Sequence, residues 1–334
     1  MRIAVGAIGL LLAPLSAWTH HSTAHYVREL HFLEGEIAAI QWRNPHIQIT
    51  LRTFDDDGQE ALWQMESNST YNLQRAGITR DLLAIGTQVR VAGQASRLED
   101  YSMLVTNLML PDGTEVVLRR DAQPLWSGPS IGGRERWLAG DGPAVQAAAE
   151  NKGIFRVWSA SEVRISTKHY PFTEAAIAGR QSWDTLDNFM TRCEGPGMPY
   201  IMDSPHPHEF VDLGDTIELR VQLFDQVRTI HVNDAASAES QPASRLGYSV
   251  GRWEDDSTLV VHTSRINWPY FDRIGTFQTE AVEVIERFSL SDDQSRLDYH
   301  MTVIDPAVFT APATMATTWL ALGDSVNTYD CAVL

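Results

Sequence analysis

Short stretches in which apolar and polar residues alternate run along most of the chain, and they predict strands more often than helices. In residues 47–54, Ile47, Ile49 and Leu51 alternate with polar neighbours, as in a strand with one buried face. Strands are expected at 32–40, 47–54, 61–66, 88–93, 103–110 and 115–118, and a short helix at 69–76. Gly35 is expected to mark a bulge. Three strands, a helix and two further strands predict a small OB-like barrel.

The same pattern returns at short spacing in the second half. Strands are expected at 154–159, 216–224, 228–232, 246–254, 258–264, 280–289, 296–304 and 314–320, and a helix at 173–180. Seven or eight antiparallel strands predict a closed barrel of the lipocalin type, which can hold one small apolar ligand. The chain is therefore predicted to be all-β, with an OB-like domain at 20–120, a linker rich in Pro and Gly at 121–152 and a lipocalin-like barrel at 153–334.

The first 19 residues have the pattern of a signal peptide. Met1 and Arg2 precede an apolar run that ends at Leu15, and small residues follow it. Cleavage after Ala17 and cleavage after Thr19 both remain open. The run is too short to span a bilayer, and no later segment is apolar enough to do so. We expect a periplasmic or secreted protein without a membrane span once the leader is removed.

A proline-rich segment at 192–210, which we call the strap, opens the second domain. Four prolines remove backbone donors and fix φ, so a packed irregular segment is expected there. The strap holds Cys193, and the other cysteine of the chain is Cys331. In an exported chain with two cysteines a disulfide is the default. We expect it to join the strap to the last strand and to stabilise the fold by about 4–5 kcal/mol.

The charge of the chain disfavours one class of partner. The 334 residues carry a net charge of -17, and such a surface repels the phosphates of nucleic acids. We therefore expect no nucleic-acid partner, although OB folds often bind oligonucleotides. No phosphate loop, dinucleotide fingerprint or nucleophile elbow is present, and no nucleotide cofactor is expected.

Histidines near the expected mature N-terminus suggest a metal site. His20 and His21 would open the mature chain, and His46 follows Asn44 and Pro45 before a strand. Imidazole suits copper and zinc, so these three are the candidate ligands of either metal. The competing interpretation is that the N-terminal histidines are solvated and that His46 is a turn residue.

Polar and aromatic side chains on the strap and on the barrel strands are candidates for ligand binding or catalysis. A few polar groups in an apolar barrel are typical of a small-ligand site. The ligand-binding candidates are Tyr248, Arg252, Trp253, His206 and His208. A histidine with a carboxylate can act as an acid–base pair, and the catalytic candidates are His231, Glu254, His262 and Asp305. Against both interpretations, half of the residues on such strands must face water.

Two groups of motifs carry a family resemblance. The first half has His20-His21-Ser22 and Trp42-Arg43-Asn44-Pro45-His46. The second half has, among others, Arg228-Thr229-Ile230-His231 and Gly247-Tyr248-Ser249-Val250-Gly251-Arg252-Trp253-Glu254. With these motifs the chain resembles a large family of exported bacterial proteins of unknown function, with an OB-like domain followed by a β-barrel domain. The resemblance implies this architecture and no established activity. Asp255-Asp256-Ser257 departs from the Gly-Asp that usually follows Trp-Glu in that family.

Three classes of function remain open at this point. The leading hypothesis is an exported protein that binds a small apolar or aromatic ligand in its barrel, with a histidine-bound metal as an added element. The alternative is a metal-assisted or acid–base enzyme, such as a lyase, isomerase or hydrolase of a small hydrophobic substrate. A structural protein of the cell envelope is the third.

Overall fold

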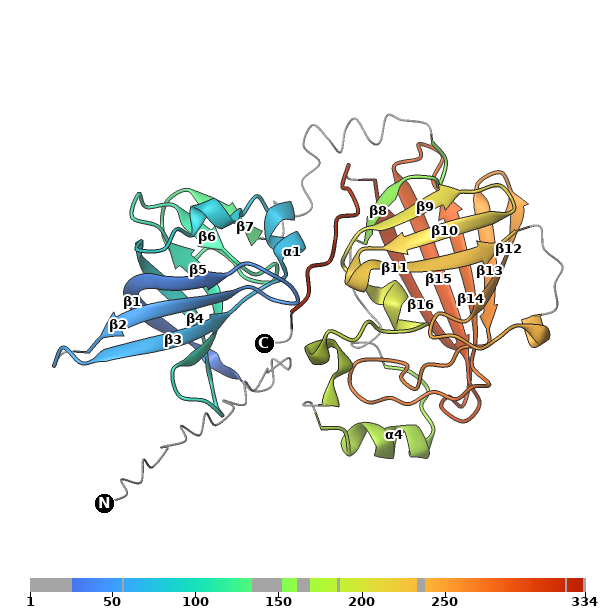
Figure 1. The fold of residues 1–334 in the computed structure, drawn as a ribbon, viewed down its shortest axis with the longest axis horizontal. Coiled ribbons are helices and arrows are strands. Elements are labelled where there is room, and N and C mark those ends of the chain that lie inside the picture. The colour runs from blue at the N-terminus through green and yellow to red at the C-terminus, as the bar shows by residue number, and fades with distance from the viewer. Residues whose placement is uncertain are drawn as a thin grey trace, which may run out of the picture.

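The computed structural model describes residues 26–55, 57–133, 152–160, 169–184, 187–232, 238–321 and 323–332. Strands prevail in them and form two units, at the left and right of Figure 1, so the all-β prediction is confirmed. The predicted leader at 1–19 and the candidate ligands His20 and His21 lie outside the described residues. In the described part, no helix has the length and apolar character needed to cross a bilayer.

The N-terminal unit is a strongly bent sheet of seven strands in the order β3-β2-β1-β4-β5-β6-β7. Its elements are β1 (Tyr26–Gln41), β2 (Gln48–Phe54), β3 (Glu60–Glu66), α1 (Thr70–Arg75), η2 (Arg80–Leu82), β4 (Gln88–Ser96), β5 (Ser102–Met109), β6 (Glu115–Val117) and β7 (Ser130–Gly132). A parallel pairing of β3 with β5 closes the first five strands into a ring. With β1 paired to both β2 and β4, this is the arrangement expected of an OB-like barrel.

Gly35 has a different role from the predicted one. It pairs regularly with Val89, and the register of β1 against β2 shifts between Ile37 and Ala39 instead. A Cβ at Gly35 would overlap the backbone carbonyl of Arg52. The residue therefore allows the close approach of β2 to the bent β1, and the bulge lies three residues further on.

The C-terminal unit is a closed barrel with the strand order β10-β11-β12-β13-β14-β15-β16-β8-β9 (Figure 1). The strands are β8 (Val157–Ala160), β9 (His208–Asp212), β10 (Thr216–Val221), β11 (Gln226–His231), β12 (Tyr248–Asp255), β13 (Thr258–Ser264), β14 (Glu283–Leu290), β15 (Arg296–Ile304) and β16 (Ala313–Leu320). Its helical elements are α4 (Glu174–Gln181), η5 (Phe189–Arg192), η6 (Tyr200–Asp203), η7 (Leu223–Asp225) and η8 (Ala238–Ser240). The pairing of β11 with β12 is parallel, whereas an eight-stranded lipocalin meander is antiparallel throughout.

The strap is packed, as predicted, and its last residues form a strand that the sequence reading missed. Residues 200–203 of the strap are buried, and His208 begins β9. The Gln226 side chain donates to the Pro196 carbonyl at 2.7 Å, and that of Gln278 donates to the Met198 carbonyl at 2.8 Å. The strap is thereby fixed to the barrel at several points.

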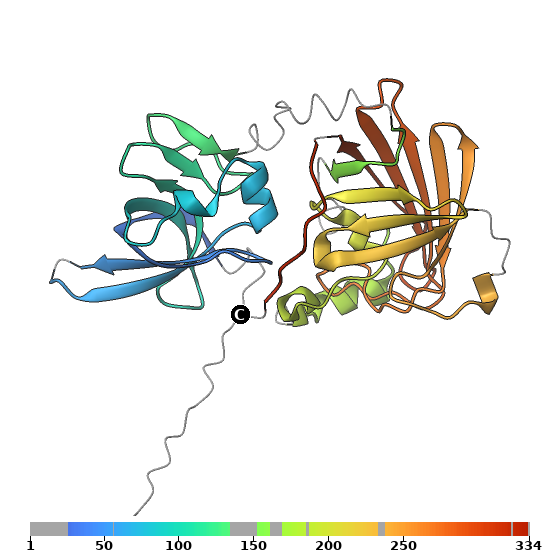
Figure 2. The ribbon, with the colours of Figure 1, turned by 45° about the horizontal axis from the view of Figure 1, so that its top comes forward.

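The predicted disulfide between Cys193 and Cys331 is present, with the two Cα atoms 5.9 Å apart. Its position differs from the expectation, because Cys331 does not lie on the last strand. That strand, β16, ends at Leu320, and residues 323–332 continue as a segment that lies between the two units in Figures 1 and 2. Cys331 forms an isolated bridge with Asn44 of the N-terminal unit. We call residues 323–332 the C-terminal segment.

Candidate functional site

The interior of the C-terminal barrel contains a buried ion pair between Arg228 and Glu286. Their side chains are 2% and 0% exposed, and the guanidinium meets both carboxylate oxygens, with Nη1 3.0 Å from Oε1. Arg228 also donates to Ser249 at 2.9 Å and to Thr263 at 2.6 Å, and the Tyr299 hydroxyl donates to Glu286 at 2.8 Å. Both charges are thus compensated by partners, as buried charges must be.

The strap covers this cluster at one point. The sulfur of Met202 lies 3.6 Å from Nη1 of Arg228. Burial, and next the charge of Glu286, raise the pKa of the Tyr299 hydroxyl well above its usual value. The hydroxyl therefore stays protonated and donates its hydrogen bond to Glu286.

His208 and Trp319 form a stacked pair in the same interior, with ring centroids 4.3 Å apart and both residues 0% exposed. Neither nitrogen of His208, nor the indole nitrogen of Trp319, has a hydrogen-bond partner of good geometry among the described residues. Burial, and next the charge of His206, lower the pKa of His208 to about 3, against a smaller opposite effect of weak hydrogen bonding to the backbone of His206 and Ile201. The ring is neutral at physiological pH, with one donor and one acceptor to satisfy.

Aromatic rings fill the space beside this pair. Phe210, Phe288 and Tyr299 all pack within 6.3 Å of the Trp319 ring, centroid to centroid. The side chains packed around this pair are therefore apolar and aromatic, apart from the histidine and indole nitrogens. Such a lining with few polar groups is typical of sites for small aromatic molecules.

The seam between the two units is a second cluster of buried polar groups, joined by Asp324 of the C-terminal segment. Its carboxylate accepts from the Tyr71 hydroxyl at 3.0 Å, from Arg75 at 3.0 Å and from the Ser159 hydroxyl. Tyr71 and Arg75 belong to the N-terminal unit and Ser159 to the barrel. Burial, followed by the charge of Asp324, raises the pKa of Tyr71, so its hydroxyl remains a donor. The network ties both units to one segment.

His206 of the strap lies in the same seam, between the rings of Tyr71 at 5.4 Å and Tyr329 at 5.2 Å. Its Nδ1 is 3.3 Å from the side-chain oxygen of Gln222. Burial lowers the pKa of His206 to about 4, and the charge of His46 contributes to the same direction. The predicted candidates His206 and His46 are therefore neighbours across the seam, whereas His208 points into the barrel.

His46 itself is bonded through Nδ1 to the carboxylate of Glu66. The charge of Glu66 also raises the pKa of Tyr26, after the larger effect of burial, so the start of β1 lies near this pair. Among the residues that the structure describes, no three His, Cys, Asp or Glu side chains gather so that they could hold a metal. Because His20 and His21 are outside that part, the metal site stays a prediction.

The four catalytic candidates lie apart from one another. His262 is 47% exposed and faces Glu283 at 3.2 Å, while Glu254 pairs with Arg287 on the outer surface. His231 stacks on Tyr248 with centroids 4.6 Å apart. Asp305 is buried, but it accepts from the backbone nitrogens of Thr279 at 2.7 Å and Ala307 at 3.1 Å, so it stabilises a turn. The described geometry does not bring a histidine and a carboxylate of this set together inside the barrel.

The remaining ligand-binding candidates lie toward the outside. Arg252 has a side chain that is 68% exposed and pairs with Glu254 at 3.4 Å. Trp253 is 37% exposed and meets Phe155 edge to face at 6.2 Å. Tyr248 is half-buried beside His231. Sequence reasoning gave little weight to Arg228, although its position two residues before the buried Ile230 places both on the inner face of β11.

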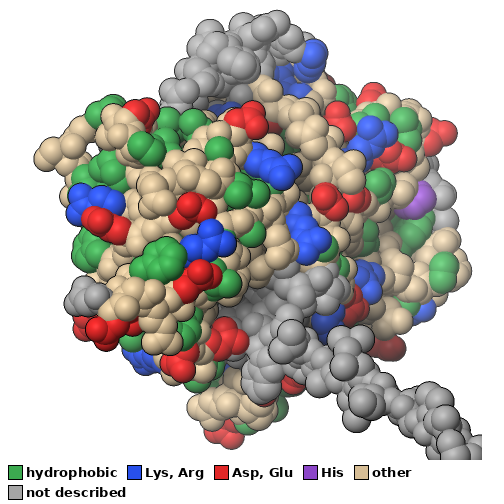
Figure 3. Space-filling view, turned by 60° about the vertical axis from the view of Figure 1, so that its left-hand side comes forward, with side chains coloured by type: hydrophobic (Ala, Val, Ile, Leu, Met, Phe, Trp, Pro, Cys, Tyr) green, Lys and Arg blue, Asp and Glu red, His purple; other side chains and the backbone are tan. Residues whose placement is uncertain are grey.

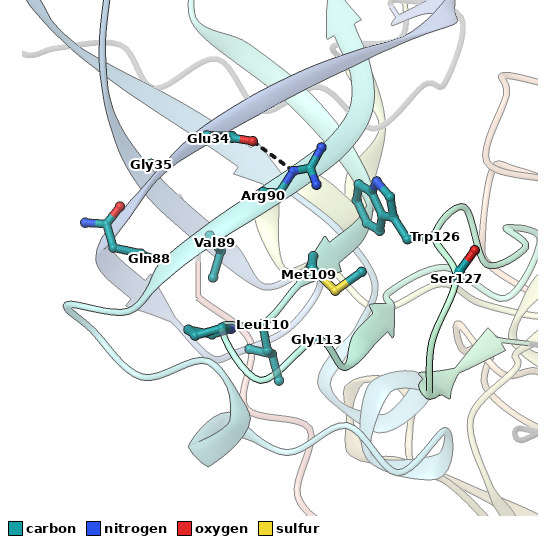
Figure 4. Close-up of a pocket in the computed structure, with 11 residues that line it drawn as sticks. Glu34, Gly35, Gln88, Val89, Arg90, Met109, Leu110, Gly113, Trp126 and Ser127 are labelled. Carbon is teal, nitrogen blue, oxygen red and sulfur yellow. Dashed lines mark ion pairs between the residues drawn. The ribbon is translucent and has the colours of Figure 1, made fainter.

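A groove of about 570 Å³ lies on the N-terminal unit, outside both regions that sequence reasoning favoured (Figure 4). β1, β4 and β5 form one side of it, and residues 126 and 127 form the other. Arg90 projects beside Trp126, with its guanidinium 5.8 Å from the ring centroid, and pairs with Glu34 at 2.8 Å. Met109 and Leu110 supply apolar surface below them.

The charges around this unit are mixed. On the face drawn in Figure 3, basic side chains are scattered among acidic ones and form no continuous stripe. A stripe of Lys and Arg is the usual electrostatic footprint of a nucleic-acid-binding face. The expectation of no nucleic-acid partner, based on the net charge of -17, stays a prediction.

The comparison with protein families gives one match. Residues 9–102 match the model of a family of unknown function (DUF6152). The match covers β1 to β4, stops at the first residue of β5, and supports a similarity of this part of the chain to an uncharacterised family. No curated protein matches the chain.

Proposed function

We propose that the chain is an exported binding protein for a small aromatic molecule that carries a hydroxyl or carbonyl group. The ligand would lie in the C-terminal barrel against His208 and Trp319. The observation that supports this most is the pair of fully buried side chains whose nitrogens have no hydrogen-bond partner of good geometry among the described residues. A buried polar group without a partner costs about 1–3 kcal/mol, and a ligand hydroxyl could both donate to His208 and accept from an indole.

The strap gives this proposal a route for the ligand. Its residues 200–203 are buried and Met202 contacts Arg228 in the interior, so a ligand bound there would have to displace part of the strap. Binding then requires that the strap moves, as covering loops do in many ligand sites. The disulfide at Cys193 would limit this movement to the part of the strap that follows it.

A titration with 2-naphthol tests the proposal, because this probe is aromatic, neutral and carries one hydroxyl group. We expect saturable binding by calorimetry, and we expect His208→Phe to weaken it about tenfold or more, since a lost hydrogen bond of about 1.5 kcal/mol corresponds to that factor. The same variant should be at least as stable as the original chain, because an apolar ring replaces an unpaired polar one.

His262→Phe is the matched control, since that histidine is 47% exposed on the outer face of the barrel. It should leave the affinity for naphthol unchanged. Equal affinities of the His208→Phe variant and the original chain, or the absence of saturable binding, would contradict the proposal.

A second candidate function is the binding of copper or zinc by His20, His21 and His46. One observation favours it: Glu66 is bonded to His46 and lies near Tyr26, which follows the N-terminal histidines in the chain. A carboxylate bonded to one imidazole nitrogen orients the ring and raises its basicity toward a metal. Calorimetry with Cu²⁺ and Zn²⁺ should then show binding that His46→Ala weakens and that is lost below about pH 6.

A further inference from the structure

The wall of the groove that Trp126 forms is fixed in place by a buried carboxylate. Glu115 is 1% exposed and accepts from the backbone nitrogens of Leu125 at 2.8 Å and Trp126 at 3.0 Å. The side chain of Asn107, itself 0% exposed, donates to Glu115 at 2.6 Å and to the Gln123 carbonyl at 2.9 Å. An irregular segment is thus held across the strands by buried hydrogen bonds, and the position of the indole is set before any ligand arrives.

The groove combines the aromatic face of Trp126 with the guanidinium of Arg90, which can exchange Glu34 for another anion. The guanidinium of Arg90 lies 5.8 Å from the Trp126 ring, and Phe32, which is 60% exposed, meets the same ring edge to face at 6.4 Å. The ion pair of Arg90 with Glu34 joins side chains that are 56% and 74% exposed. Exposed pairs of this kind contribute little to stability, so a better-placed anion can replace Glu34.

The shape and the chemistry together select a class of ligand. A groove of about 570 Å³ is within the usual range for small-molecule sites. The planar guanidinium matches the two oxygens of a carboxylate, the indole offers a face for a flat ring, and Met109 and Leu110 supply apolar contact. We infer that this groove is a second binding site, independent of the barrel, for small aromatic carboxylates.

In this site the ring of the ligand packs on Trp126 and its carboxylate takes the place of the Glu34 carboxylate on Arg90. Glu34 then faces the bound carboxylate, and the repulsion between the two negative charges weakens the binding of the ligand. This gives the two charged residues opposite effects on affinity. A site for cations would show the reverse signs, because Glu34 would then attract the ligand and Arg90 would repel it.

The test is a titration of the purified chain with 2-naphthoate, the neutral 2-naphthamide and the cationic 2-naphthylmethylamine. Calorimetry should give the tightest binding for the carboxylate. Arg90→Gln should weaken it about tenfold or more, and Glu34→Gln should strengthen it. Trp126→Phe should weaken naphthoate binding less than Trp126→Ala does. The indole NMR resonance that disappears in Trp126→Phe belongs to Trp126, and in the original chain naphthoate should shift it.

Arg52→Gln is the matched control, because Arg52 is another strand arginine of this unit and pairs with Glu36 at 2.9 Å outside the groove. It should leave unchanged the shift that naphthoate causes in the Trp126 indole resonance, a signal that reports on the groove and not on the barrel. The inference is overturned if naphthoate fails to bind, if the three probes bind equally, if Arg90→Gln binds as tightly as the original chain, or if Glu34→Gln weakens binding.

Discussion

Arg228 is a single residue on which the stability of the barrel depends, because it neutralises the buried charge of Glu286. Both charges are almost fully removed from water, and each is compensated chiefly by the other. Arg228→Met would leave the Glu286 carboxylate without its counter-charge in a closed apolar interior. We expect the free energy of unfolding, measured with urea, to fall by about 3–5 kcal/mol.

The control for this prediction is a pair of the same chemistry on the outer face of the barrel. Arg220 and Glu218 are 2.9 Å apart with side chains 43% and 28% exposed, and Arg220→Met should cost less than about 1 kcal/mol. In the interior, the double variant Arg228→Met with Glu286→Gln should recover part of the loss. A double variant no more stable than Arg228→Met would contradict the assignment of the loss to an uncompensated charge.

The two buried histidines make the protein sensitive to acid. Burial lowers the folded-state pKa of His206 to about 4 and that of His208 to about 3, whereas both titrate near 6.5 in the unfolded chain. The unfolded state therefore binds more protons below pH 6.5, and stability falls as the pH drops toward the folded pKa values. Each histidine should remove about 1.4 kcal/mol per pH unit in this window.

Urea unfolding at about pH 7.5 and about pH 5 measures this effect. The double variant His206→Phe and His208→Phe should have a smaller difference between the two conditions than the original chain. His262→Phe, which changes an exposed ring, should keep the original difference. An unchanged pH dependence in the double variant would show that other groups cause the acid sensitivity.

At the scale of single residues, the sequence predicted the disulfide but not the ion pair of the interior. Cys193 and Cys331 had no alternative partners, so counting them was sufficient. Arg228 and Glu286 lie 58 positions apart on strands that are not adjacent, and many other charges were available to each. Their proximity follows from closure of the barrel, which no local pattern specifies.

The strap is packed so closely at Gly197 that even one added methyl group would overlap its neighbours. A Cβ at Gly197 would come within 2.5 Å of the Trp268 ring and of the Arg245 carbonyl. We expect Gly197→Ala to lower the free energy of unfolding by about 1–3 kcal/mol, as overpacked positions do. Thermal and urea unfolding of the purified variant measure the change.

Gly179 in α4 is the matched control for this substitution. A Cβ there would meet its nearest atom, on Phe277, at an ordinary 3.5 Å. Gly179→Ala should stabilise the chain by up to about 1 kcal/mol, because alanine is the better helix former. If both alanine variants had the same effect, close packing of the strap would not be the cause.

At the scale of elements, strands with alternating patterns were predicted well and irregular ones were not. The predicted ranges 258–264 and 296–304 coincide with β13 and β15, because inward apolar and outward polar residues alternate along them. The prediction for β10 continued to Phe224, but the extended chain ends at Val221 because Gln222 has helical φ and ψ and begins the turn of η7. β9 was missed, since the prolines before it suggested that the whole strap was irregular.

The whole molecule depends on the seam that the C-terminal segment completes. Asp324→Ala would remove the carboxylate shared by Tyr71, Arg75 and Ser159. We expect a loss of about 1–3 kcal/mol and, in calorimetry, separation of one unfolding transition into two as the units uncouple. Asp298→Ala, at an exposed pair with Arg296, should neither lower the free energy of unfolding by this amount nor divide the transition. A single transition in both variants would contradict the role of Asp324.

The sequence predicted two units but not how they are joined. The residues that meet at the seam come from three distant parts of the chain, and no local pattern indicates that they meet. Asp324 follows the last strand, in a segment without regular structure, and Tyr71 is one aromatic residue of a short helix. Long-range polar contacts of this kind depend on the final arrangement of the units, which local preferences do not encode.

The C-terminal segment also has a consequence for the order of assembly during synthesis. Residues 323–332 leave the ribosome only after both units have been made, yet they carry the groups that hold the units together. The joint between the units therefore forms only after the strands of both units have been synthesised. A stop codon after Leu320 would retain the residues of every strand of both units and remove Asp324 and Cys331, which hold the units together.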